Sequence, residues 1–257
     1  MPDLTRPDGC TLYYETHGPA DGEPLLLLEG LGGDIPGRRR NIPTLAEELL
    51  VVAFDLRGNG RSDAPDDALT MGTFVEDAVA VLRLVGVDAA HVYGQSFGGM
   101  IAMELALTHP DRVRSLILAA THPGVVHASP VGSKVPKDRP WEALYATGFP
   151  EANPEHVAED LAVGSQQPQA PHARRRQWEA MQSFDAFDRL PELAVPVLVL
   201  HGTEDRMVSP ANAPILAERI PGAELVLLDG AGHLYHSERA AEADAAVLDF
   251  VRRHAGG

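Results

Sequence analysis

The chain has 257 residues, of which 44% are hydrophobic and 23% charged, which suits one large α/β domain and excludes wholesale disorder. A formal net charge of −16 disfavours binding to nucleic acid or to an anionic membrane surface, because both are negatively charged. Cys10 is the single cysteine, so no intramolecular disulfide can form. The first residues lack the apolar run of a signal peptide and no apolar stretch could span a bilayer, so we expect a cytoplasmic protein.

Short apolar runs alternate with longer amphipathic stretches along most of the chain. The runs predicted to be strands are Thr11–Thr16, Leu25–Leu28, Val51–Phe54, Ala89–Tyr93, Val113–Ala119, Val195–His201 and Glu224–Leu228. The predicted helices are Pro43–Leu50, Thr70–Val85, Phe97–Thr108, one that begins at Ser209 and Pro210, and one that Ser237 caps and that ends near Arg252 and Arg253. This alternation predicts an α/β fold with a mostly parallel, doubly wound sheet.

Residues 122–190 interrupt this rhythm, because they contain many prolines and no apolar run typical of a strand. Short helices are predicted over Trp141–Thr147, Pro154–Val163 and Ala173–Phe187. We therefore interpret residues 122–190 as a small helical cap that is inserted into a core made of residues 1–121 and 191–257.

A glycine-rich motif around Ser96 carries the chemistry. An apolar run leads into Gly94-Gln95-Ser96-Phe97-Gly98, and a predicted helix follows directly. Glycines permit the sharp turn that lifts a serine hydroxyl clear of a sheet, and the helix that begins there offers free N–H groups and the positive end of its dipole. This context predicts a nucleophilic serine at the junction between the strand and the helix.

A nucleophilic serine requires a base and an acid that orients the base. Asp205 follows one predicted strand, and His233 lies in a glycine-rich loop after the next. Together with Ser96, both lie at the carboxyl ends of predicted strands, where open α/β sheets build their sites. Ser96, Asp205 and His233 are therefore the predicted nucleophile, acid and base.

Other residues near these positions are weaker candidates. Glu204 and Asp229 are alternative acids, and His201 and His236 are alternative bases. His201 directly follows an apolar run and is interpreted as a structural residue. No third ligand accompanies His233 and His236 at the spacing of a metal site, so neither a metal nor a cofactor is expected.

Two backbone N–H groups are needed to stabilise an oxyanion. Phe97 follows the nucleophile and is expected to supply one of them. Leu31, in the glycine-rich stretch after the strand predicted over Leu25–Leu28, is expected to supply the other.

At these residues the chain resembles an α/β-hydrolase-fold protein, and the resemblance extends from about Thr11 to Val251. The stretches that carry it are Glu29–Gly32, Asp55–Ser62, the motif around Ser96, His109–Val113, Gly202–Pro210 and Gly232–His233. The chain is most similar to the branch that contains 3-oxoadipate enol-lactonases, small esterases and cofactor-free haloperoxidases, or perhydrolases. The resemblance implies that Ser96, Asp205 and His233 form the triad.

Two residues depart from the pattern of this family. Many relatives have histidine where this chain has Glu29, and a carboxylate directed into the oxyanion site would oppose the developing charge. We therefore expect Glu29 to point away and to tie down its loop through backbone N–H groups or Arg57, and we expect Arg57 itself to pair with Asp55. Leu31 stands where perhydrolase-like relatives often carry an aromatic residue, which disfavours perhydrolase activity.

The residues that line the substrate pocket are harder to predict. We expect them to include Gly30, Trp141, Phe149, Trp178, Met207 and Leu234. The aromatic side chains between positions 122 and 190, which include Phe184, could equally form the small core of the cap. The arginine triplets at Arg38–Arg40 and Arg174–Arg176 are interpreted as solvated faces, and either would favour an acidic substrate if it faced the cleft.

These observations together predict a serine hydrolase that cleaves a small-molecule carboxylic ester through an acyl-enzyme. A lactonase and a perhydrolase use the same residues and are the alternatives. A more remote alternative is a ligand receptor on the same fold without catalytic activity.

Overall fold

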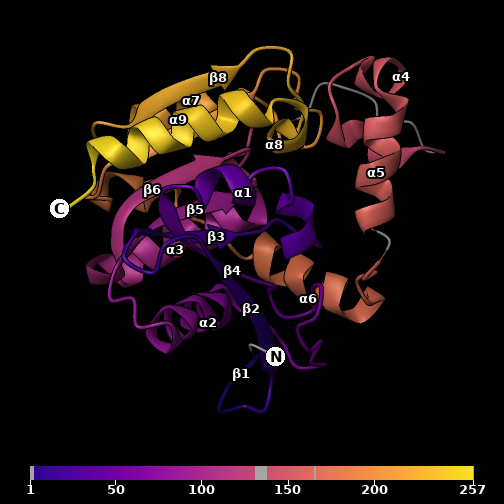
Figure 1. Cartoon of the computed structure of the whole chain (residues 1–257). Helices are drawn as coiled ribbons and strands as arrows, with labels where there is room; N and C mark the ends of the chain where they lie inside the picture. Colours follow the sequence, from indigo (N-terminus) through magenta and orange to yellow (C-terminus); the bar gives the residue numbers. More distant parts are fainter. Residues whose placement is uncertain (1–2, 131–137, 165, 257) are drawn as a thin grey trace.

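The computed structural model describes residues 3–130, 138–164 and 166–256, and its centre is one mixed sheet (Figure 1). Within these residues the sheet has eight strands in the order β1-β2-β4-β3-β5-β6-β7-β8. The strands are β1 Asp3–Thr5, β2 Thr11–His17, β3 Glu23–Leu28, β4 Leu49–Phe54, β5 Ala90–Gln95, β6 Val113–Ala119, β7 Val197–Gly202 and β8 Glu224–Leu228. Every strand expected from the apolar runs is present, and β1 is an addition.

The strands from β3 to β8 are parallel, whereas β1 and β2 form an antiparallel hairpin that joins the sheet through β4. The carboxyl ends of the parallel strands therefore meet along one edge of the sheet. The strand order reverses direction at β3, as in a doubly wound sheet, which confirms the expected fold class.

Helices cover both faces of the sheet. The helices outside residues 122–190 are η1 Ile35–Arg38, α1 Ile42–Leu45, α2 Met71–Leu84, α3 Phe97–Thr108, η2 Pro110–Arg112, α7 Asn212–Arg219, α8 Tyr235–Glu238 and α9 Ala240–Arg253. One apolar core packs α2, α3 and α7 against the sheet, and a second packs α1 and α9 against the opposite face. In the described part of the chain, no helix combines the length and apolarity needed to cross a membrane.

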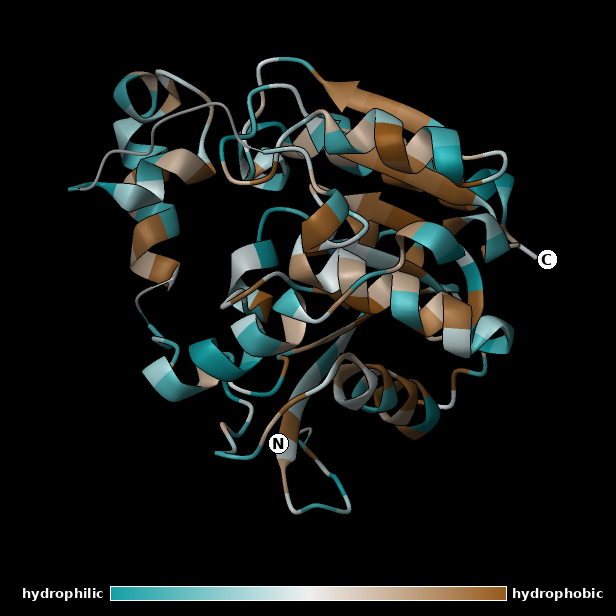
Figure 2. Cartoon of the chain, turned by 180° about the vertical axis from the view of Figure 1, so that it is seen from behind, coloured by the Kyte–Doolittle hydropathy of each residue, from teal (hydrophilic) through white to brown (hydrophobic). Residues whose placement is uncertain are grey.

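The side chains of β3 show how one strand serves both cores. Leu26 and Leu28 belong to the core under α2 and α3, while Leu25 and Leu27 belong to the core under α9. Successive side chains of a strand point to opposite faces, so a strand covered on both faces is apolar throughout. Figure 2 shows the strands of the sheet mainly in the colour of hydrophobic residues.

Three predicted helix boundaries in the core were wrong, and in residues 122–190 the helices expected over Ala173–Phe187 and Trp141–Thr147 end earlier, at Gln182 and Leu144. The helix expected over Pro43–Leu50 ends at Leu45, because the chain must enter β4 at Leu49. Helix α7 begins at Asn212, two residues after Pro210, and the backbone oxygen of Ser209 accepts the Asn212 N–H at 3.0 Å. Ser237 lies inside α8 instead of capping α9, because its hydroxyl donates to Asp160 at 2.6 Å.

Residues 122–190 lie between β6 and β7 and contain no strand in their described part, although Gly124 and Asp185 form an isolated bridge. The elements are η3 Val125–His127, η4 Pro140–Leu144, α4 Phe149–Ala152, α5 Pro154–Gly164, α6 Pro171–Gln182 and η5 Phe187–Glu192. Figure 1 shows α4, α5 and α6 along one side of the molecule. Leu234, after β8, donates its N–H to Leu144 at 2.8 Å, so η4 contacts a loop at the carboxyl edge of the sheet.

Candidate active site

Ser96 occupies a strained turn between β5 and α3. Its φ of 53° lies in the left-handed region, which non-glycine residues rarely adopt. The turn is tight: a Cβ at Gly94 would lie 2.3 Å from the backbone oxygen of Gly98, and one at Gly98 would lie 2.0 Å from that of Leu28. Only glycine fits at these two positions, and their neighbours Gln95 and Phe97 are buried while Ser96 is partly exposed. The surrounding packing therefore presents the serine at the surface of the site.

The loop after β3 lies beside Ser96. A Cβ at Gly30 would contact the Ser96 Cβ at 3.4 Å and the Ser96 Oγ at 3.9 Å. The loop then forms a turn in which the Gly33 N–H donates to the Gly30 oxygen at 3.1 Å and Gly32 has a φ of 76°. Leu31 is the second residue of this turn, so its N–H directly follows the glycine that touches the serine.

The N–H groups of Leu31 and Phe97 are both available to a ligand. Phe97 is the first residue of α3, and the first N–H groups of a helix have no partner within it. Among the hydrogen bonds of the described residues, none uses the N–H of Leu31 or Phe97. Two free N–H donors are one requirement of an oxyanion site.

Asp205 and His233 are hydrogen-bonded to each other, with 2.7 Å between Asp205 Oδ2 and His233 Nδ1. The N–H groups of Met207 and Val208 donate to Asp205 Oδ1 at 2.8 and 2.9 Å. Burial alone raises the pKa of Asp205, but the charge of His233 and the hydrogen bonds from His201 and His233 outweigh it and hold the pKa well below its usual range. The carboxylate is therefore ionised at neutral pH and can orient the imidazole.

The alternative acids and bases have other partners. Glu204 accepts the N–H of Thr147 at 3.0 Å, and Asp229 accepts the hydroxyl of Thr203 at 3.3 Å. His201 is fully buried, and its Nε2 lies 3.1 Å from Asp205 Oδ2. It is therefore a structural residue that helps to hold the Asp205 carboxylate in place. Burial, with a further contribution from nearby positive charge, lowers the pKa of His236 well below its usual range.

Glu29, in the loop after β3, pairs with Arg38, so the expected pairing with Arg57 was wrong, and its Oε2 would lie 3.1 Å from a Cβ at Gly33 of the same loop. Arg38 Nε donates to Glu29 Oε1 at 2.5 Å, and the Arg38 side chain is only 1% exposed. The interpretation of Arg38 as part of a solvated face was therefore wrong. Its neighbours Arg39 and Arg40 form ion pairs with Asp160 and Glu159 of α5, so these two arginines face the helix while Arg38 turns into the core.

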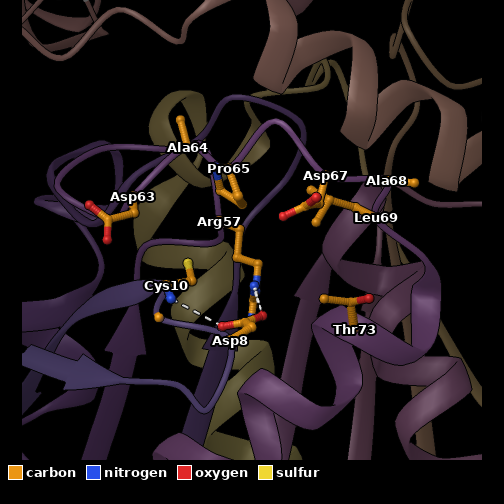
Figure 3. Close-up of a pocket in the computed structure, with 11 residues that line it drawn as sticks. Asp8, Cys10, Arg57, Asp63, Ala64, Pro65, Asp67, Ala68, Leu69 and Thr73 are labelled. Carbon is orange, nitrogen blue, oxygen red and sulfur yellow. Dashed lines mark hydrogen bonds and ion pairs between the residues drawn. The ribbon is translucent and has the colours of Figure 1, made fainter.

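Arg57 serves the fold at a different place. It forms a double hydrogen bond with Asp77 of α2 and donates to Asp8 at 2.5 Å, so the expected pair with Asp55 was wrong. Asp55 instead accepts backbone N–H groups from Ile35 and Arg61. A hollow of about 450 Å³ lies beside the β1–β2 hairpin, and Figure 3 shows Arg57 there, directed toward Asp8.

Residues 23–240 match the family described as alpha/beta hydrolase fold. The chain belongs to the α/β-hydrolase family. RutD of Azorhizobium caulinodans, provisionally named a carbamate hydrolase, is 33% identical over 241 residues, which cover 87% of this chain and 88% of RutD. The structure of an enol-lactonase from Burkholderia xenovorans superposes with a TM-score of 0.85 at 25% identity. The match covers 98% of this chain and 100% of the enol-lactonase chain. Est816, described as an N-acyl homoserine lactone degrading enzyme, has a TM-score of 0.83 at 30% identity. The match covers 97% of this chain and 100% of the Est816 chain.

The aromatic residues expected in the pocket of this α/β hydrolase contact one another. Phe149 stacks on Tyr145 with ring centroids 5.8 Å apart, and Trp141 meets the edge of the same ring at 6.4 Å. Phe184 is buried in the core under α3. For Trp141 and Phe149 the contacts favour a small core of the inserted segment, which was the alternative interpretation.

The other residues expected to line the pocket are spread around the site. Gly30 touches Ser96, and Leu234 follows His233 and hydrogen-bonds to the inserted segment. Trp178 on α6 is 50% exposed and Met207 is 45% exposed. Both of these side chains lie at the outside of the hydrolase.

The second arginine triplet lies on α6. Arg175 and Arg176 form exposed ion pairs with Glu179 of the same helix, as expected for a solvated face. Arg174 differs, because its Nη1 would lie 3.9 Å from a Cβ at Gly32 of the oxyanion loop. One arginine of this triplet thus reaches the edge of the site.

Sequence reasoning missed Glu238, which joins the loop of the candidate base to residues 122–190. Glu238 Oε1 accepts the N–H of Gly232 at 3.2 Å and that of Ala146 at 3.1 Å. Burial raises the pKa of Glu238 to about 7 despite these two hydrogen bonds, and Glu204 adds to the rise. The spacing of Glu238 from His233 carries no recognisable signal, because the partner Ala146 is distant in the sequence.

We expect Glu238→Gln to increase stability at neutral and alkaline pH, with little effect in acid. Between the unfolded pKa near 4.5 and the folded pKa of about 7, the native state binds a proton that the unfolded state has lost, so stability falls as the pH rises through this range. Glutamine keeps the acceptor oxygen without the charge. The unfolding free energies of the two proteins should match at pH 5, and the variant should be more stable at pH 8 by about 1–2 kcal/mol, a figure reduced for solvent screening. Urea unfolding measures this, and an equal difference at both pH values would contradict it.

Proposed function

We propose that this α/β hydrolase is a serine hydrolase that cleaves carboxylic esters through an acyl-enzyme. The observation that carries the proposal is the hydrogen bond of 2.7 Å between Asp205 and His233, on loops adjacent to a serine held at a φ of 53°. Gln95, next to Ser96, donates to the backbone oxygen of His233 at 3.0 Å, so the serine and the histidine lie on neighbouring segments. A nucleophile, a base and an acid that orients the base are the requirements for acyl transfer.

In the first half of the reaction, His233 Nε2 accepts the proton of the Ser96 hydroxyl as the oxygen attacks the ester carbonyl. Asp205 holds the proton on Nδ1 of the imidazole and stabilises the imidazolium that forms. The carbonyl oxygen becomes an oxyanion, for which we propose the N–H groups of Leu31 and Phe97 as donors. These donors act together with the positive end of the α3 dipole.

In the second half, His233 gives its proton to the departing alkoxide and leaves the acyl group on Ser96. Water, deprotonated by the same histidine, then attacks the acyl-enzyme, and the Ser96 oxygen departs with that proton from His233 as the carboxylic acid is released. The two bonds between heavy atoms that break are carbon–oxygen bonds, and the imidazole transfers the proton in each step. The cycle needs no group beyond the side chains and N–H groups of this chain.

We propose that residues 122–190 act as a cap over this site, because they bind loops that follow β7 and β8. The Thr147 N–H donates to Glu204 after β7, and the Leu144 oxygen accepts from Leu234 after β8. A cap in this position would determine which acyl and alcohol groups enter. The pocket-lining role of Gly30 and Leu234 is proposed from their places beside Ser96 and directly after His233.

Lactones are the second candidate class of substrate. Similarity to an enol-lactonase and to a protein described as degrading N-acyl homoserine lactones favours them, since a lactone is a cyclic ester that uses the same chemistry. The similarity to RutD adds carbamates to the substrates to be compared. All three classes present a carbonyl with an oxygen or nitrogen leaving group to Ser96.

A substrate series together with an active-site label tests the proposal. The series contains p-nitrophenyl esters from acetate to decanoate, an enol-lactone, an N-acyl homoserine lactone and an aryl carbamate. We expect turnover of the esters, and a fluorophosphonate adduct that peptide mass spectrometry locates on Ser96. A chain that is neither labelled nor active on any class would contradict the proposal and favour a ligand receptor on the same fold.

A further inference from the structure

A buried arginine lies between the three segments that carry the proposed chemistry. Arg38 Nε donates to Glu29, at the start of the oxyanion loop, at 2.5 Å. Arg38 Nη2 donates to the side-chain oxygen of Gln95, the residue before Ser96, at 2.6 Å. Arg38, Glu29 and Gln95 are 1%, 6% and 3% exposed, so this charge is shielded from water and from substrate.

Gln95 extends this contact to the loop of the base. Its Nε2 donates to the backbone oxygen of His233 at 3.0 Å, while its Oε1 accepts from Arg38. One amide group thus links the arginine, the strand that ends at Ser96 and the loop that carries His233. Both ends of the amide are used, which fixes the orientation of the side chain.

A pair of tyrosines makes a second link between the same segments. The hydroxyls of Tyr93 on β5 and Tyr235 on α8 lie 2.7 Å apart, and Arg38 Nη1 lies 3.5 Å from the Tyr93 hydroxyl. Both rings are buried. Tyr235 is two residues after His233, so this link also restrains the loop of the base.

We infer that Arg38, Glu29, Gln95, Tyr93 and Tyr235 form a positioning network that sets the geometry of Ser96, His233 and the oxyanion loop relative to one another. The inference rests on the proposed function, because the segments that it aligns are those of the proposed triad and oxyanion site. None of the five side chains hydrogen-bonds to the Ser96 hydroxyl or the His233 ring, so they are positioning residues.

Physical chemistry gives a reason for such a network at this place. A buried ion pair contributes little to stability, because removal of its charges from water offsets their attraction, but its hydrogen bonds are strongly directional. Ser96, the loop of Glu29 and the loop of His233 follow three different strands. The hydrogen bonds of the sheet end where the strands end, so they do not fix the positions of these loops relative to one another. A displacement of about 1 Å at reacting atoms can cost about 10²-fold in rate.

Gln95→Met tests the inference, because methionine has a similar volume and can neither accept from Arg38 nor donate to His233. We expect kcat to fall about 10²-fold with KM within about threefold, and the rate of fluorophosphonate labelling of Ser96 to fall in parallel. The midpoint of the acid limb of the kcat/KM pH profile should stay in place, because the Asp205–His233 hydrogen bond is retained.

Two further variants keep the test sharp. Tyr235→Phe removes the hydroxyl that bonds to Tyr93 and faces the charge of Arg38, and should lower kcat about three- to tenfold without loss of folding. Ser115→Ala is the matched control, because it removes the buried hydrogen bond of 2.7 Å to His91 on the neighbouring strand without any link to the network. It should lower Tm and leave kcat and the labelling rate unchanged.

The outcomes separate the network from the proposed function. Reduced labelling in Gln95→Met and Tyr235→Phe but not in Ser115→Ala supports the network. Wild-type labelling rates in both network variants, or an equal loss in Ser115→Ala, overturn it while the hydrolase proposal stands. A wild-type chain that is neither labelled nor active overturns both.

Discussion

Replacement of Ser96 with alanine is expected to lower kcat on p-nitrophenyl esters by about 10⁶-fold, the loss that removal of a nucleophile causes in measured triads. Alanine removes only the hydroxyl oxygen, without which no acyl-enzyme can form. It also keeps a Cβ at a backbone position with a φ of 53°, so the local strain does not change. We therefore expect Tm to remain within a few degrees of the wild-type value, and steady-state kinetics with calorimetry measure both quantities.

A matched control for this variant is Ser183→Ala. Ser183 is exposed near the end of α6, and its hydroxyl donates to Ala180 at 2.8 Å, far from the proposed chemistry. Its kcat should equal that of the wild type. Retention of more than about one hundredth of the activity by Ser96→Ala would show that another group attacks the substrate.

Replacement of Asp205 with asparagine is expected to lower kcat by about 10⁴-fold, the loss seen when a triad carboxylate becomes an amide. The structure indicates which way the amide turns. The N–H groups of Met207 and Val208 both donate to Oδ1, so the amide oxygen will occupy that position and the NH₂ group will face His233 Nδ1. Nδ1 then accepts a hydrogen bond from the amide, the single ring proton lies on Nε2, and the imidazole can no longer act as a base toward Ser96.

Asp229→Asn is the control for this change, because Asp229 is an exposed carboxylate at the end of β8 that the sequence offered as an alternative acid. It should retain wild-type kcat. Fluorophosphonate labelling of Ser96 should slow in Asp205→Asn and stay normal in Asp229→Asn. Equal kinetics for the two variants would show that Asp205 is not the orienting acid.

The strands were predictable because parallel strands covered on both faces are apolar at nearly every position. Only β1 was missed, since Asp3–Thr5 is short and has exposed ends. The boundaries that failed depend on distant partners. Ser237 has the sequence of a helix cap, but Asp160 takes its hydroxyl, and no local pattern reveals an acceptor on another element.

The same distinction applies to the site. Ser96, Asp205 and His233 were placed at strand ends by local motifs, and the structure brings Asp205 and His233 within hydrogen-bonding distance. The partner of Glu29 could not be predicted, because a buried arginine and an exposed one look alike in a sequence. Arg38 belongs to a triplet typical of a solvated face, and only the packed fold shows that its side chain is enclosed.

The ion pairs of Arg39 and Arg40 fasten α5 to the core mainly by charge. Val157 is the buried residue that α5 itself contributes, and the Glu159 side chain is 65% exposed. A segment held by few apolar contacts opens with a small free energy, and dissolved ions screen the charges that hold it. The amide hydrogens of α5 can therefore exchange with solvent while those of the sheet remain protected. Because Ser237 also donates to Asp160 of this helix, added salt should raise the frequency of its opening only in part, and should change the global unfolding free energy much less.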